Sequence, residues 1–332
     1  MDFTHFTAQK DDDGRRLDKI IRKLLADGDL SGLYKSIRKG LIKVDGKKSS
    51  PDAKIQEGAD ISVASFLLTK MQETENNLAE KISPLENSDL VVFRNKDLLL
   101  LNKPYDSLVQ PASNYSGAIV LSQLVEEDFN ISHKGTSLSF KPGPLHRLDR
   151  QTSGLLAFSQ SLKGARWFSE EIQQHSVKKI YIGIAQGKIQ EKQRWSDFIE
   201  REQNTETRFH TVKADSQKTD SSKNANTTVQ PLAYGLYETI DVTLAEFLIE
   251  TGRTHQIRAQ SALHGHPLLG DTAYGGRKTK PDEQNLYLHA YELRFPQNNA
   301  LEMPEKINAF ISTKFKKMLT KTLIKWDGNL IL

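Results

Sequence analysis

The chain has 332 residues, of which 37% are hydrophobic and 27% charged, and it carries a formal net charge of +4. This composition is that of a globular protein of about two domains, and since no run of about eighteen apolar residues occurs, we expect no transmembrane helix and no membrane partner. The absence of cysteine excludes disulfides, thiolate metal ligands and cysteine nucleophiles. Because the first residues also lack the basic and apolar regions of a signal peptide, we expect a cytoplasmic protein.

A small basic module is predicted near the start of the chain, over residues 15–66. Apolar residues at helical spacing predict helices over 15–25 and 31–40, and an Asp-Gly turn within 41–47 predicts a hairpin. Residues 15–60 contain twelve Lys or Arg against seven Asp or Glu, a surplus of five positive charges, so the rest of the chain is close to neutral. A basic module beside a larger neutral one favours binding to a polyanion, although a solvated basic face explains the charge about equally well.

Four segments lack a convincing hydrophobic period. We expect residues 1–14 to be an untethered lead-in and residues 67–88 to be an interdomain linker. Residues 203–228 are rich in Asn, Thr, Ser and Lys and poor in apolar side chains, which predicts an exposed excursion. Residues 301–332 form a C-terminal extension whose basic, helix-like stretch suggests no role.

The remaining part, residues 89–300, is predicted to form a larger α+β domain, because apolar runs alternate with amphipathic stretches. Residues 239–250 are apolar on both faces, which is typical of a central strand that is covered on two sides. The expected strands lie at 90–93, 98–101, 155–158, 178–187, 239–250, 286–290 and 293–295, and the expected helices at 116–129, at 161–175 and after Thr254.

The motif richest in chemical groups is His-Arg-Leu-Asp-Arg-Gln-Thr-Ser-Gly-Leu-Leu, at residues 146–156. Its single carboxylate, Asp149, stands between Arg147 and Arg150, and nearby positive charge favours the ionised form of a carboxylate. An ionised carboxylate that a loop holds in place suits a nucleophile or an electrostatic stabiliser better than a general acid. From these residues alone, the alternative is a turn residue flanked by surface ion pairs.

This motif resembles the signature of the RluA family of RNA pseudouridine synthases. Further stretches resemble that family in the same order along the chain: Asn-Lys-Pro at 102–104, Lys-Ile-Tyr at 179–181 and Arg-Thr-His-Gln-Ile-Arg at 253–258. Residues 105–113 depart from it, because the family usually has a Gly-rich segment there. The resemblance implies an α+β fold with a mixed, mostly antiparallel, bent sheet flanked by helices.

The basic module resembles the S-four-like RNA-binding domain, which is named after a small-subunit ribosomal protein. The stretches that carry this resemblance are Arg-Leu-Asp at 16–18, the Tyr-Lys-Ser-Ile-Arg-Lys-Gly run at 34–40 and Val-Asp-Gly-Lys at 44–47. In that module the helix pair presents its basic side to folded RNA, where phosphate contacts supply affinity without reading sequence. The RNA-binding residues that the resemblance implies are Arg16, Lys35, Arg38 and Lys39.

Three further residues match active-site positions of the RluA family. The resemblance implies that Asp149 is catalytic, that Tyr181 contacts the base, and that Arg258 holds the Asp149 carboxylate by a charge-assisted, bidentate pair. It also implies that Arg147 fills the space left by a flipped base. From the residues alone, Tyr181 is as well explained as a half-buried strand residue, and Arg147 as an ion-pair partner.

The resemblance thus implies an isomerase that makes pseudouridine in large-subunit ribosomal RNA, needs no cofactor and no metal, and acts as a monomer. His264, His266 and Asp271 suggest a metal site only weakly, because His-x-His with one Asp is a poor signal. Two other classes stay open. One is a non-catalytic RNA-binding protein of ribosome assembly, and the other is a hydrolase of glycosidic bonds, for which a second carboxylate is normally needed.

Overall fold

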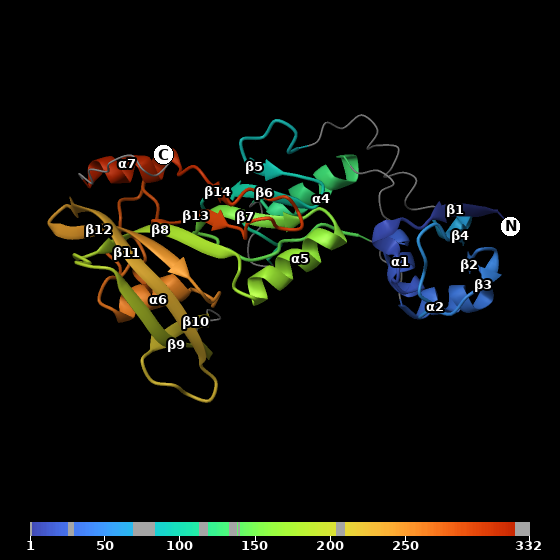
Figure 1. Cartoon of the computed structure of the whole chain (residues 1–332), viewed down its shortest axis with the longest axis horizontal. Helices are drawn as coiled ribbons and strands as arrows, with labels where there is room; N and C mark the ends of the chain where they lie inside the picture. Colours follow the sequence, from blue (N-terminus) through green and yellow to red (C-terminus); the bar gives the residue numbers. More distant parts are fainter. Residues whose placement is uncertain are drawn as a thin grey trace.

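The structure is a computed structural model that describes residues 2–25, 30–68, 84–112, 119–132, 138, 140–203 and 210–322. It contains a small four-stranded sheet near the N-terminus and a large mixed sheet in the rest of the chain. Figure 1 shows the small sheet, in blue, at one end of the molecule and the large sheet at the other. Within the described ranges, no helix has both the length and the apolarity that crossing a membrane requires.

The small sheet is antiparallel and is packed against two helices. Its strand order is β1-β4-β2-β3, and the helices are joined in sequence before β2. Asp45 and Gly46 both have positive φ, 48° and 73°, as the predicted Asp-Gly hairpin requires. The elements are β1 (Phe3–Thr7), α1 (Leu17–Leu24), α2 (Leu30–Lys39), β2 (Ile42–Val44), β3 (Lys47–Lys48) and β4 (Asp60–Ala64).

The expectation of an untethered lead-in over residues 1–14 is wrong. Strand β1 pairs with β4 along its whole length, from Phe3 opposite Ala64 to Thr7 opposite Asp60, and a short 3-10 helix, η1 (Lys10–Asp12), follows it. The buried Asp12 carboxylate also accepts a hydrogen bond from the amide of Leu138, which lies 126 residues further along the chain. The sequence did not predict this strand, because a five-residue edge strand is stabilised by its distant partner and has no clear hydrophobic pattern of its own.

The large sheet has the strand order β10-β9-β11-β12-β8-β13-β7-β6-β5, with β14 paired to β13. All neighbours are antiparallel except β13 and β7, so the sheet is mixed, as expected. Its strands are β5 (Val91–Arg94), β6 (Leu98–Lys103), β7 (Ser153–Ser159), β8 (Lys178–Gln186), β9 (Gln193–Gln203), β10 (His210–Asp215), β11 (Lys223–Tyr237), β12 (Ile240–Ile249), β13 (Leu288–Arg294) and β14 (Lys306–Asn308).

Helices cover both faces of this sheet, which explains its continuous apolar runs. Along β6, Leu99 and Leu101 pack into one cluster with residues of α4 and α6, whereas Leu98 and Leu100 pack into another with residues of α5. A third cluster joins α7 to β8 and β12, so β12 is covered on two sides, as predicted. The helices are α4 (Leu121–Ser132), α5 (Leu162–Gln173), α6 (Gln256–Leu263) and α7 (Thr313–Lys321).

The expected excursion over residues 203–228 contains regular strands, so that expectation is wrong. Strand β10 pairs with β9, and the first part of β11 pairs with the other edge of β9. The buried positions at the start of β11 alternate and hold Ala225, Thr227 and Val229. Because these side chains are small or polar, the strand lacks the strong apolar alternation that predicts one. Residues 204–209 lie outside the described residues.

Candidate active site

Asp149 lies in the loop that enters β7, and this loop is anchored by side chains that point into the core. Leu148 joins the main cluster between the sheet and α4 and α6. His146 stacks on Phe168 of α5, with ring centroids 6.0 Å apart, and its Nε2 accepts a hydrogen bond from the amide of Ala157. Burial lowers the pKa of His146 to about 3, and its contacts with Phe168 and Ala157 give it a structural role in holding the loop.

Lys103 anchors the other side of the Asp149 loop. It ends β6, its side chain is fully buried, and its Nζ donates to the carbonyl oxygens of Arg150 and Thr152, both at 2.8 Å. A third bond of 3.0 Å goes to the carbonyl of Pro104. Burial lowers the pKa of Lys103 to about 7, while the Asp149 carboxylate acts in the opposite direction. Lys103 lies in the Asn-Lys-Pro family motif at residues 102–104, but the sequence predicted no role for it.

Arg258, in the first half of α6, connects Asp149 to a second carboxylate. Its Nη1 lies 3.5 Å from Oδ2 of Asp149. The expected bidentate pair is formed instead with Asp271, through Nε to Oδ2 at 2.7 Å and Nη2 to Oδ1 at 2.8 Å. Arg258 and Asp271 are 6% and 2% exposed, so the pair is desolvated and fixes the guanidinium. One guanidinium therefore binds a structural carboxylate on one edge and faces the candidate catalytic carboxylate with its remaining nitrogen.

A histidine also lies next to Asp149. The Nε2 atom of His255 is 3.6 Å from Oδ2 of Asp149, and its Nδ1 atom is 2.8 Å from the hydroxyl of Tyr274. His255 is the N-cap residue of α6, so the helix begins one residue later than expected. The sequence predicted no role for His255, although it lies inside the family motif at residues 253–258.

Tyr181 lies on β8, where its register partners are Phe247 on β12 and Ala290 on β13. The side chain is 7% exposed and belongs to the main core cluster. Burial raises the pKa of its hydroxyl well above the usual value, and the negative charge of Asp149 adds to the shift. Tyr181 is therefore a protonated phenol within electrostatic range of Asp149.

The two arginines beside Asp149 differ in their surroundings. Arg147 is exposed. Arg150 forms an ion pair of 3.2 Å with Asp106, in the loop after β6, and its carbonyl accepts from the Asp106 amide. Asp106 belongs to the segment that departs from the family pattern, and these two contacts connect it to the Asp149 loop.

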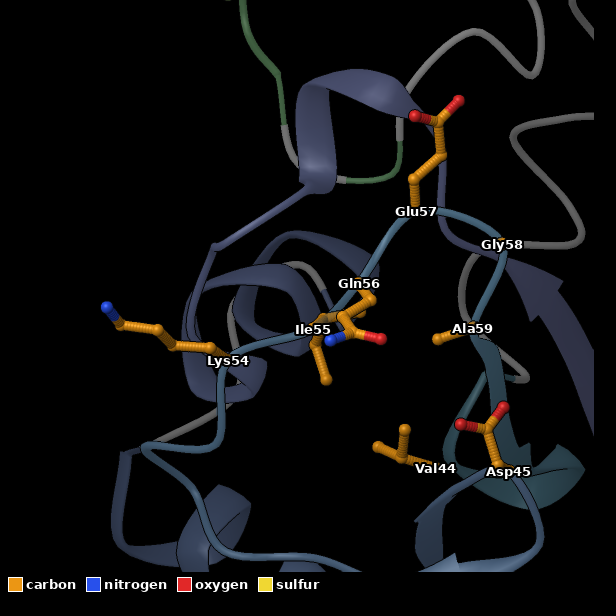
Figure 2. Close-up of a pocket in the computed structure, with 8 residues that line it drawn as sticks. All are labelled: Val44, Asp45, Lys54, Ile55, Gln56, Glu57, Gly58 and Ala59. Carbon is orange, nitrogen blue, oxygen red and sulfur yellow. The ribbon is translucent and has the colours of Figure 1, made fainter.

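The four residues expected to bind RNA lie on the small domain. Lys35, Arg38 and Lys39 are exposed on α2. Arg16 is exposed as well, but its guanidinium donates to both carboxylate oxygens of Asp18, at 3.1 and 2.9 Å. A hollow of about 340 Å³ lies on the same domain and is lined by residues 44–45 and 54–59 (Figure 2). Its charged side chains are of both signs, Asp45, Lys54 and Glu57, and none of them was expected to bind RNA.

The histidines that hinted at a metal site bind other protein groups. His264 lies 3.0 Å from the Asp197 carboxylate and stacks on Trp195, and His266 pairs with the carbonyl of Gln186. Asp271 is occupied by Arg258. Across the described ranges, no three His, Cys, Asp or Glu side chains are grouped as metal ligands.

Residues 97–263, about half of the chain, match the family model described as RNA pseudouridylate synthase. This stretch contains Asp149, Tyr181 and Arg258. The chain belongs to the RNA pseudouridylate synthase family. It is therefore an isomerase that converts uridine to pseudouridine in RNA.

Similar proteins carry names of the same kind. The ribosomal large subunit pseudouridine synthase D of Neisseria meningitidis is 31% identical over 293 residues, which cover 85% of this chain and 72% of the relative. The ribosomal large subunit pseudouridine synthase C of Vibrio vulnificus is 26% identical, with 92% of each chain covered. The structure of human RNA pseudouridylate synthase domain containing 4, at 19% identity, shares the fold with a TM-score of 0.55 over 71% of this chain and 93% of that chain.

Proposed function

We propose that this pseudouridine synthase modifies large-subunit ribosomal RNA and that Asp149 is its catalytic residue. The observation that supports the site is the environment of one carboxylate: Asp149 lies on an anchored loop, with Arg258 at 3.5 Å and His255 at 3.6 Å from the same oxygen. The guanidinium of Arg258 places a full positive charge 3.5 Å from this carboxylate, opposite the negative charge that the chemistry uses. Asp149 is 29% exposed in its side chain, so the group that reacts is accessible.

The reaction breaks the bond between ribose C1′ and uracil N1 and forms a bond between C1′ and uracil C5. The proton on C5 is lost and N1 gains one, so atoms and electrons balance without a cofactor. Asp149 supplies the negative charge at the reacting nucleotide. Burial raises the pKa of Tyr181, so its side chain meets the base uncharged, which suits packing against the uracil ring.

The target uridine must leave its stack to reach Asp149, as in other enzymes that act on a base. Arg147 directly precedes Leu148 and Asp149 in sequence and is exposed, which suits a side chain that fills the vacated position. A guanidinium can stack on the neighbouring bases and pair with phosphate.

Ribosomal RNA as the substrate is supported by the names of the relatives and by the charge of the small domain. The relatives in Neisseria and Vibrio are named for the large ribosomal subunit and are similar along most of this chain. Lys35, Arg38 and Lys39 form an exposed basic stretch on α2, which suits phosphate contacts that position a folded RNA. We propose that residues 15–66, together with β1, form this RNA-binding domain, that residues 89–300 form the catalytic domain, and that the protein acts as a cytoplasmic monomer.

The test compares RNA classes. Large-subunit RNA, small-subunit RNA and transfer RNA are transcribed with tritium on uracil C5, and the release of tritium into water is followed with purified protein. The proposal predicts release from large-subunit RNA alone. Release from transfer RNA alone contradicts the substrate, and tight binding of every RNA without any release favours a non-catalytic binding protein.

A variant separates the small domain from the catalytic site. Replacing Lys35, Arg38 and Lys39 together by Gln is expected to weaken RNA binding and to reduce its salt dependence, because each cationic side chain that contacts phosphate displaces counterions. The turnover rate at saturating RNA should stay close to that of the wild type. An unchanged affinity at low and high salt would show that α2 does not contact RNA.

A further inference from the structure

His255 contacts Asp149, and Tyr274 contacts His255. Neither side chain has been assigned a part in the bond-breaking or bond-forming steps. His255 reaches Asp149 through Nε2 at 3.6 Å and Tyr274 through Nδ1 at 2.8 Å. The two rings meet edge to face, with centroids 5.8 Å apart and planes at 87°. Tyr274 belongs to η3 (Thr272–Tyr274), directly after Asp271, so the histidine and the arginine beside Asp149 are both supported by the same short segment.

Tyr274 links the two groups that flank the carboxylate. Its hydroxyl pairs with His255, and its ring lies under the guanidinium of Arg258, with Cζ 4.9 Å from the ring centroid. Such a cation–π contact restrains a guanidinium that already binds Asp271. The arrangement places both neighbours of Asp149 close to its Oδ2 atom, His255 at 3.6 Å and Arg258 at 3.5 Å.

The hydrogen bond to Tyr274 bears on the tautomer of His255. It can run in either direction, and donation from the Tyr274 hydroxyl to Nδ1 leaves the proton of a neutral imidazole on Nε2, the nitrogen that faces Asp149. A donor is then presented to the carboxylate without a second full positive charge. The separation of 3.6 Å is long for a hydrogen bond, but catalytic hydrogen bonds in unliganded enzymes often shorten when substrate binds.

The backbone of His255 adds an independent observation. Its φ of 53° and ψ of 22° place it in the left-handed region, which non-glycine residues seldom adopt. Strained positions of this kind persist where the surrounding structure holds them, and they cluster at functional sites.

We propose that His255, oriented by Tyr274, is a positioning residue that holds Asp149 in its reactive orientation. The proposal rests on Asp149 being the catalytic residue. It assigns to His255 a donor role at Nε2 and to Tyr274 the role of fixing the tautomer that makes this donor available.

Two substitutions of His255 separate a positioning role from a structural one. In His255→Gln the side-chain amide reaches about as far as Nε2, so it can still donate to Asp149. In His255→Asn the amide is too short to reach, although Asn adopts the left-handed conformation most readily of the ordinary residues. A purely structural role therefore predicts that Asn is tolerated better, whereas the positioning role predicts that Gln is.

The measurement is the single-turnover rate of pseudouridine formation with enzyme in excess over RNA, together with RNA affinity and thermal melting. We expect a loss of about tenfold for His255→Asn and of less than about threefold for His255→Gln, since one hydrogen bond to a charged group is at stake. RNA affinity should not change in either variant. Equal rates in the two variants, or a faster rate in His255→Asn, would overturn the proposal.

Tyr274→Phe tests the link without changing His255, and it keeps the ring under Arg258. We expect a loss similar to that of His255→Asn, and no further loss when both substitutions are combined, because the two residues act through one contact. Rate losses that multiply in the double variant would show that Tyr274 does not act through His255. If His255→Asn fails to fold, Tyr274→Phe alone decides, since a wild-type rate then contradicts the proposal.

Two controls complete the design. His175 is exposed, outside the site, and has a φ of 56°, so His175→Asn makes the same change in the same backbone conformation and should leave the rate unchanged. Asp149→Asn should abolish the reaction. If Asp149→Asn remains active, the proposed catalytic residue is wrong, and this outcome is distinct from a failure of the His255 variants in an otherwise valid site.

Discussion

The double pairing of Arg258 makes a quantitative prediction for Arg258→Lys. Three nitrogens of one guanidinium face two carboxylates: Nε and Nη2 bind Asp271, and Nη1 faces Asp149 at 3.5 Å. A lysine keeps the charge but has a single ammonium, and it cannot reproduce this geometry. Because Asp271 is almost fully buried, we expect the ammonium to pair with Asp271 and to leave Asp149 without its cation.

The size of the effect follows from the geometry. Two unit charges about 4 Å apart attract by about 4 kcal/mol at the effective dielectric near a protein surface. Asp149 is partly exposed, and solvent screening reduces this to about 2–3 kcal/mol, which corresponds to a rate loss of roughly a hundredfold. The free energy of unfolding should fall by about 1–2 kcal/mol, since one of two charge-assisted bonds to Asp271 is lost.

The assay is the single-turnover rate with saturating enzyme, beside urea unfolding of the free protein. The matched control is Arg94→Lys, because Arg94 binds both oxygens of the buried Asp128, at 3.1 and 3.0 Å, away from the candidate site. Both contacts come from Nη2 of Arg94, which a lysine ammonium can replace, so this control should lose less stability than Arg258→Lys and keep the wild-type rate. A wild-type rate in Arg258→Lys would refute the argument that Arg258 acts on Asp149.

Three further predictions concern the support of the site. Lys103→Met leaves three carbonyls in or near the core without their donor. We expect a loss of about 2–4 kcal/mol in the free energy of unfolding and a slower reaction. A stable and fully active variant would contradict the anchoring role. Burial lowers the pKa of His289 to about 4 and that of His146 to about 3, but the unfolded chain protonates both near pH 6.5. The unfolded state therefore binds more protons below that pH, and urea titrations should show stability falling by up to about 1.4 kcal/mol per histidine and pH unit, with a smaller slope in His289→Gln. Gly154→Ala should abolish folding, because a Cβ there would lie 2.2 Å from the carbonyl oxygen of Ala290 at a φ of 109°, and soluble, two-state unfolding of this variant would show that β7 can move away from β13.

Part of the site could be predicted because its residues lie in contiguous motifs. Asp149 stands in an eleven-residue motif, and Arg258 closes another, so a resemblance along the chain was enough to select them. The structure brings these two within 3.5 Å of each other and keeps Tyr181 within electrostatic range. Their distances and their exact partners could not be predicted, because they depend on how distant strands and helices pack.

The supporting residues were missed for the same reason. Lys103 acts on the carbonyls of Arg150 and Thr152, which are almost fifty residues away along the chain. Asp271 had been considered as a weak metal ligand, since a carboxylate near two histidines has that meaning in a sequence, yet it binds Arg258. Only tertiary contacts distinguish these two roles of a carboxylate.

The strands that were predicted have strong hydrophobic patterns of their own, and the strands that were missed do not. The leucine run of β6 and the doubly apolar β12 were predicted, because their side chains must be covered on both faces. Strand β1 and the strands within residues 203–228 were missed, since their pairing partners and not their own hydrophobic patterns hold them in place.

The proposed role of Asp149 in making pseudouridine is tested by comparing the wild type with Asp149→Asn on large-subunit ribosomal RNA that carries tritium on uracil C5. Asparagine has nearly the same shape and cannot carry the negative charge. We expect tritium release by the wild type and none by the variant, which should still fold and bind RNA. Release by a folded Asp149→Asn protein at the wild-type rate would contradict this role.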